Sequence, residues 1–359
     1  MPLKKPLLLD AVLGNARMLI TFDRQGRVHH LFWPQIDFAQ HISQLRLGLV
    51  SPALGAGVLW LEDRPWEHRQ SYHPRAALLR TTITNQRLGL TVYLDDCVWP
   101  DGDILVRRLT LENSSPTTLP VGVLLYSALD IEESRRYNTV YFDWDQQALL
   151  HYRRDRWFAF GADRAAAGYQ CGREQGGESA WSDCEDGLLS GRGIENGDTD
   201  GAVLWPLEEV GPGGRARLSI FLAAGHNSAE ALRGLALARR KGGDRLLEEA
   251  EAHWQRWLSR ARPLAGAHPA VEQLYYRSLM TLKLLSDERH GAFIAAPEFD
   301  PDRIGCGGYG YCWGRDASYI ATAFDEAGCH QEARAFYRWA KRVQDPRGVW
   351  YQRYYVDGH

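Results

Sequence analysis

The feature that most constrains the fold of this chain is a change in hydrophobic period close to residue 226. Before that point, short runs of β-branched and aromatic residues alternate with turn residues, and "LGLTVYLDDCV" (88–98) alternates apolar and polar positions. After it, apolar residues recur every three or four positions. Strands and helices bury side chains with periods of 2 and 3.6, so the pattern predicts a β domain followed by a helical part.

The first part, residues 1–226, is predicted to be an antiparallel β-sandwich, because its many short strands have no helical segments between them. The predicted strands lie in "RMLITFD", "VHHLFWP", "GVLWLE", "LLRTTITN", "LGLTVYLDDCVW", "ILVRRLTLEN", "VGVLLYSALDI" and "GRARLSIFLAAGH". The glycine-rich, polar stretch 161–201 is predicted to form long loops.

A helical linker is predicted over residues 227–267. Asn227 with Glu230 three positions later is typical of a capping box at a helix start. The apolar residues spaced to form one helical face in this linker are Leu247, Ala250, Trp254, Trp257 and Leu258.

Residues 268–359 contain three further predicted helices. In the first, Pro269 suits the opening turn, and the predicted core face consists of Val271, Leu274, Leu282 and Leu285. The second and third have predicted core faces at Ile320, Ala323, Phe324 and Ala327, and at Ala333, Phe336, Tyr337 and Ala340. Three helices leave apolar faces without partners, so this part is expected to be an incomplete, truncated domain.

The charge of the chain argues against polyanionic partners. A formal net charge of −3 supplies no basic surface for nucleic acid or anionic membranes. No apolar run approaches the roughly twenty residues that span a bilayer, and Asp10 interrupts the apolar N-terminal stretch. We therefore expect a cytoplasmic protein with no nucleic-acid or membrane partner.

The cysteines lack the spacing of a zinc site or a redox pair, and free, mostly buried thiols are expected. They are Cys97, Cys171, Cys184, Cys306, Cys312 and Cys329. We predict no metal site and no cofactor.

The segment "GCGGYGYCWGRD" (305–316) places aromatic rings among glycines and ends in a charge pair at a helix start. Glycines allow close approach of a ligand, and Tyr309 and Trp313 offer flat apolar walls for a sugar ring. Arg315 and Asp316 offer donors and acceptors for its hydroxyl groups. The same residues also fit a structural role, in which Asp316 caps the helix, Arg315 is its surface partner and Trp313 packs under the loop.

The stretch from "AAPEFDP" to "GYGYCWGRDASYIATAFDEAG" and "HQEARAFYRWA" (295–340) resembles the glucoamylase family, glycoside hydrolase family 15. In that family an aromatic loop ending in Trp-x-Arg-Asp leads into a helix of an (α/α)6 barrel, a six-hairpin toroid. The run "DAVLGNARMLITFDRQGRVHHLFWPQID" (10–37) is similar to the start of the bacterial members, which carry a β-sandwich ahead of the barrel.

The resemblance implies an inverting exo-glycosidase acting on an α-linked glucose oligosaccharide or glucoside. Tyr309 would stack on the non-reducing terminal glucose, Arg315 and Asp316 would bind its hydroxyl groups, and Trp313 would support the wall. The sequence leaves open whether the linkage is α-1,4, α-1,6 or that of trehalose. The catalytic residues are unknown, because the family's acid and base glutamates are expected beyond residue 359. Glu298 is a local candidate for lining the pocket.

Two other functions remain open at this stage. A non-catalytic carbohydrate-binding module would need the sandwich and the aromatic loop but no acid and base. An assembly partner would use exposed helix faces to bind a C-terminal chain that completes the barrel.

Overall fold

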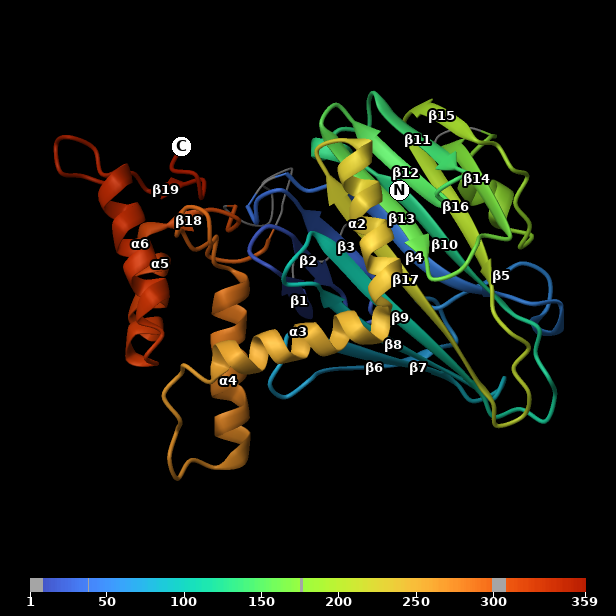
Figure 1. Ribbon diagram of the computed structural model, residues 1–359, viewed down its shortest axis with the longest axis horizontal. Coiled ribbons are helices and arrows are strands. Elements are labelled where there is room, and N and C mark those ends of the chain that lie inside the picture. Colours follow the sequence, from blue (N-terminus) through green and yellow to red (C-terminus); the bar gives the residue numbers. More distant parts are fainter. Residues whose placement is uncertain (1–8, 38, 175–176, 299–307) are drawn as a thin grey trace.

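The computed structural model describes residues 9–37, 39–174, 177–298 and 308–359 of the chain. Two antiparallel sheets form a β-sandwich, and a helical part extends from one side of it (Figure 1). A small third sheet packs against the sandwich, and its buried residues belong to the large core. Its strands are β1 (Ala11–Gly14), β2 (Leu19–Phe22) and β3 (Val28–Phe32). The predicted fold class, an antiparallel sandwich followed by helices, is confirmed.

The larger sheet has nine strands. In spatial order they are β15 (Ile194–Gly197), β11 (Asn138–Asp143), β12 (Ala148–Arg153), β13 (Arg156–Ala162), β17 (Arg215–Gly225), β9 (Ile104–Asn113), β8 (Leu90–Val98), β7 (Leu79–Asn85) and β6 (Glu67–Tyr72). The smaller sheet contains β14 (Gly168–Arg173), β16 (Thr199–Pro206), β10 (Gly122–Leu129), β4 (Ile42–Val50) and β5 (Val58–Trp60).

The alternation along the strands assigns their side chains to two different cores. In β9, Leu105 and Leu109 are buried in the large core between the sheets. Val106, between them in sequence, is buried in a second core on the outer face of the nine-stranded sheet. Successive strand residues point to opposite faces, so a strand covered on both sides must be apolar on both.

Two helices supply the cover for that outer face. They are α2 (Ser228–Lys241) and α3 (Gly243–Leu258), and both pack on the sheet (Figure 1). The predicted cap at Asn227 is confirmed, because its side-chain oxygen accepts the Glu230 N–H at 2.9 Å. The Glu230 carboxylate reaches back one residue further than expected and accepts the His226 N–H at 2.9 Å.

The prediction of long loops over 161–201 is wrong. This stretch contains β14, the short helix α1 (Ala180–Cys184), β15 and the start of β16. Glycines and polar residues weaken the local strand signal. The strands form because their backbone groups pair over long range, as Cys171 does with Gly201. A local pattern does not contain that information.

The C-terminal helices are α4 (Pro269–Leu284), α5 (Gly314–Glu326) and α6 (His330–Val343). Pro269 opens α4 as predicted, and Gly328 ends α5 with a φ of 85°. The predicted core face of α4 is partly wrong. Val271 and Leu274 are 53% and 65% exposed.

The buried face of α4 carries Tyr276, Leu279, Met280 and Leu284 instead. Tyr337 of α6, also predicted to face the core, is 55% exposed. Apolar periodicity marks both sides of these helices, and only the contacts made in the fold select the buried side.

The helices and the sandwich are joined by specific polar contacts. The Arg277 guanidinium on α4 lies 3.7 Å from the Tyr72 ring centroid and donates to the carbonyls of His73 and Ala76. Within the helical part, the Glu332 carboxylate on α6 accepts the Trp257 indole N–H from α3 at 2.9 Å. These contacts hold α4 against the sandwich and α6 against α3.

Candidate functional site

The loop before α5 is fixed on two sides by backbone hydrogen bonds. Its last residues form β18 (Cys312–Trp313), which pairs with β19 (Arg353–Tyr354) from the C-terminal segment. On the other side, the Ala295 and Ala296 N–H groups donate to the carbonyls of Tyr311 and Tyr309 at 3.0 and 3.1 Å. The glycine-rich segment is therefore held in one arrangement over the residues that the structure describes.

Two aromatic rings form a wall in this loop. The ring centroids of Tyr309 and Trp313 are 6.4 Å apart at 37°, and Tyr309 is 43% exposed. The Trp313 indole N–H donates to the Gly308 carbonyl at 3.2 Å, which fixes the indole. A half-exposed ring beside a fixed indole offers flat apolar area to a ligand.

The charge pair lies beside the wall, in the first turn of α5. The Arg315 side chain is 79% exposed, the Asp316 side chain is 37% exposed, and their closest charged atoms are 3.6 Å apart. Trp313 holds the N-cap position, and no side chain makes a cap hydrogen bond there. The alternative in which Asp316 is the cap is therefore wrong, because Asp316 lies three residues inside the helix end.

Arg353 is a residue of this site that sequence reasoning missed. Its guanidinium carbon lies 4.7 Å from the Tyr311 ring centroid and 5.7 Å from that of Trp313. Cation–π contacts of this kind hold rings in place. The aromatic-rich "YQRYY" around Arg353 was the only signal in the sequence, and its pairing with β18 depends on the fold.

Tyr355, from the same segment, packs against Tyr311. Their ring centroids are 4.9 Å apart, and their hydroxyl oxygens are 3.4 Å apart. The hydrogen bond to Tyr311, together with burial, raises the pKa of Tyr355 to about 12.

A loop of the sandwich contacts the C-terminal segment that carries Tyr355. Asp37, between β3 and β4, accepts the Val356 N–H at 2.6 Å through Oδ2. Its Oδ1 is buried and has no hydrogen-bond partner in the part of the chain that the structure describes. Burial, reinforced by the nearby carboxylates of Asp287 and Asp357, raises the pKa of Asp37 to about 7.

Glu298 lies near the loop. A Cβ atom placed on Gly310 would lie 3.3 Å from the Glu298 carbonyl oxygen. The backbone segments around Glu298 and Gly310 therefore pass close to each other. Burial raises the pKa of the Glu298 carboxyl. Cys306, also in the motif, lies outside the described residues, whereas the other five cysteines are buried free thiols.

One group of carboxylates elsewhere was not expected from the sequence. Ligand atoms of Asp130, Glu174 and Asp198 lie within 4.8 Å of one another on the sandwich. The Arg135 guanidinium is 3.5 Å from Asp130 and already supplies positive charge to the group. Burial raises the pKa of Glu174 to about 7.

With this geometry established, the comparisons with known proteins assign the family. Residues 11–259 match the family described as glucodextranase, domain N, and residues 269–358 match glycosyl hydrolases family 15. The chain belongs to the family described as glucodextranase, domain N, and its C-terminal part matches glycosyl hydrolases family 15. Its sandwich with α2 and α3 corresponds to the first match, and the aromatic loop and α4–α6 fall within the second.

Two solved structures support the fold of this chain. A bacterial glucoamylase complexed with acarbose has a TM-score of 0.81 at 16% identity, covering 99% of this chain and 52% of that one. A putative kojibiose phosphorylase from the human microbiome has a TM-score of 0.61 at 11% identity, covering 90% and 45%. At these identities the similarity shows the fold alone.

A curated relative extends the match in sequence. An uncharacterised glycosyl hydrolase of Methanocaldococcus jannaschii is 26% identical over 372 residues, covering 98% of this chain and 56% of the relative. The chain thus spans about half the length of the relatives it matches. Among the residues that the structure describes, no helix is both long and apolar enough to cross a membrane.

Proposed function

We propose that this chain is part of an inverting, exo-acting hydrolase of α-glucosidic bonds and that the loop before α5 binds the terminal glucose. The observation that carries the proposal is the Tyr309–Trp313 wall next to the exposed Arg315–Asp316 pair. Sugars present apolar C–H faces and a rim of hydroxyl groups, and this pairing of surfaces matches both.

In this proposal, Tyr309 stacks on the sugar and Trp313 supports the wall. Arg315 donates to the hydroxyl groups of the sugar and Asp316 accepts from them. Arg353 holds the Trp313 ring in place and is a positioning residue. The similarity to a bacterial glucoamylase supports an α-linked glucose oligosaccharide or glucoside as the ligand.

Inversion at an α-glucosidic bond requires one carboxylic acid to protonate the leaving oxygen and one carboxylate to activate water. We assign neither role to a described residue. Glu298 is proposed to line the pocket. The remaining helices of an (α/α)6 barrel, with the acid and base, are proposed to come from polypeptide outside this chain. Five buried free thiols are consistent with the reducing cytoplasm as the location.

Arg315→Ala is expected to weaken binding of an α-glucan by about 10-fold to 100-fold, because a hydrogen bond to a charged group contributes about 1.5–3 kcal/mol. The measurement is a titration of the purified chain with maltotriose, isomaltotriose and trehalose, followed by proton NMR of the sugars. Arg347→Ala is the matched control. Arg347 is also exposed but pairs with Asp345 at 2.8 Å, away from the wall. Equal affinity of the Arg315→Ala variant and the unmodified chain would contradict the assigned role.

The same NMR samples test the catalytic part of the proposal. We expect no hydrolysis by this chain alone. If β-glucose appears first, the bond is cleaved with inversion, and a described carboxylate such as Glu298 must then supply chemistry that we place elsewhere.

An assembly role is supported by a separate observation. Some of the exposed apolar side chains of the helical part lie on its helices, namely Val271, Leu274, Tyr319 and Tyr337. We propose that further helices cover them, in the same polypeptide or a partner chain. Light scattering with and without a candidate C-terminal chain tests this, and an unchanged mass would count against a separate partner.

A further inference from the structure

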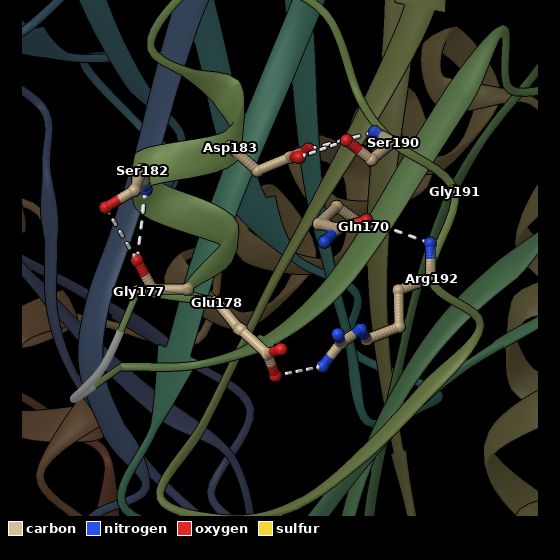
Figure 2. Close-up of a pocket in the computed structure, with 9 residues that line it drawn as sticks. Gln170, Gly177, Glu178, Ser182, Asp183, Ser190, Gly191 and Arg192 are labelled. Carbon is tan, nitrogen blue, oxygen red and sulfur yellow. Dashed lines mark hydrogen bonds and ion pairs between the residues drawn. The ribbon is translucent and has the colours of Figure 1, made fainter.

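The sandwich contains a polar pocket far along the chain from the aromatic loop. Its volume is about 510 Å³, and it lies between α1 and the edge strand β14 (Figure 2). Its walls are formed by Gln170, Gly177, Glu178, Ser179, Ser182, Asp183, Ser190, Gly191 and Arg192. Ligand pockets for small molecules commonly have volumes of about 300–1,000 Å³.

The side chain of Gln170 on β14 lines this pocket. Gln170 is 5% exposed, and its Oε1 accepts the Arg192 backbone N–H at 2.9 Å. That N–H fixes which end of the amide is oxygen, so the NH2 group must face the other way. Figure 2 shows this nitrogen directed toward the pocket. Within the described part of the chain it has no hydrogen-bond partner.

The rest of the wall has both donors and acceptors available. The Arg192 side chain uses Nη1 to pair with Glu178 at 2.6 Å and Glu195 at 2.9 Å. No described residue accepts from its Nη2. Asp183 accepts the Ser190 backbone N–H at 3.0 Å, and the Ser179 hydroxyl donates to that of Ser182 at 3.0 Å. The Ser182 hydroxyl proton is therefore available to a ligand.

These groups select the class of ligand. A free N–H donor on Gln170 cannot ligate a cation, so a metal does not satisfy it. Carboxylates at Glu178 and Asp183 repel an anion. A neutral molecule with many hydroxyl groups both accepts from Gln170 and Arg192 and donates to the carboxylates. The free donors, the acidic residues and the volume together fit a sugar.

We propose that this pocket is a second carbohydrate site, which binds one or two sugar units of a glycan on the sandwich. The site is independent of the loop before α5, because no residue is shared and the contacts described above lie within the sandwich. The Gln170 amide nitrogen supplies the central hydrogen bond. The carboxylate–arginine pairs hold the walls in position.

The test uses the whole chain with ¹⁵N-labelled glutamine side chains. The Gln170 amide resonances are assigned by their absence in Gln170→Glu, which keeps the acceptor for the Arg192 N–H and removes the donor. On titration with maltotriose we expect these resonances to shift with saturation. Glycerol at the same hydroxyl concentration is expected to leave them in place.

The variants separate the two sites. In Arg315→Ala the Gln170 shift should persist. Gln170→Glu lacks these resonances, so its binding is followed through the proton signals of maltotriose, and it should be weaker by about tenfold. The matched control is Gln86→Glu, which changes an exposed glutamine in the β7–β8 turn and should have no effect. Gln170 resonances that stay fixed in maltotriose, or that shift equally in glycerol, would overturn the proposal. So would a Gln170 shift that disappears with Arg315→Ala, because it would then report on the loop site.

Discussion

Arg107→Met is expected to lower the free energy of unfolding by about 3–5 kcal/mol, because it leaves a buried carboxylate without its partner. Arg107 on β9 and Asp96 on β8 are register partners and are 2% and 0% exposed. Their two hydrogen bonds are 2.8 and 3.3 Å long. Arg107 also donates to the Gly26 carbonyl at 2.7 Å, which ties the β2–β3 turn to the large sheet.

Urea denaturation followed by tryptophan fluorescence measures this change. The double variant Arg107→Met with Asp96→Leu should recover most of the loss, because it removes both charges together. Arg215→Met is the matched control. Arg215 on β17 pairs at 2.7 Å with Glu112, which lies near the end of β9, but the Arg215 side chain is 61% exposed. This substitution should cost less than about 1 kcal/mol. If Arg107→Met and Arg215→Met cost the same, the buried pair does not have the importance assigned to it.

Asp37→Asn is expected to stabilise the protein above pH 7, by up to about 4 kcal/mol at pH 8. The pKa of Asp37 is raised to about 7 in the fold, from an unfolded value of about 3.9. The native state therefore binds the proton more tightly than the unfolded state. The stability that protonated Asp37 contributes is fully present below about pH 4 and is lost as the pH rises through about 7.

Asparagine keeps an oxygen to accept the Val356 N–H but cannot ionise, so the variant avoids that loss. Urea denaturation midpoints of both proteins at pH 5 and pH 8 measure this loss of stability. The difference in midpoint between the variant and the unmodified chain should be larger at pH 8. Asp145→Asn, in the exposed β11–β12 turn, is the control and should show no such widening. A constant gap between pH 5 and pH 8 would mean that Asp37 does not titrate between them. Since Val356 adjoins Tyr355, this contact also links the sandwich to the aromatic loop.

The sequence by itself determined the classes of structure and their order. Alternation in runs such as 88–98, and helical spacing around Trp254 and Trp257, are local consequences of where Cβ atoms point. The Asn227 cap and Pro269 in the opening turn of α4 also depend only on neighbouring backbone groups. Such features can be predicted because the interactions that cause them span a few residues.

Only the tertiary structure decided which surfaces meet. β14 and β15 form inside a glycine-rich stretch because distant strands supply their hydrogen bonds. Arg353 joins Trp313 through a pairing across about forty residues, and Asp37 joins Val356 across 319. The Gln170 pocket likewise requires α1 and the edge of β14 to come together. These contacts depend on long-range burial and hydrogen bonding, which no local pattern in the sequence encodes.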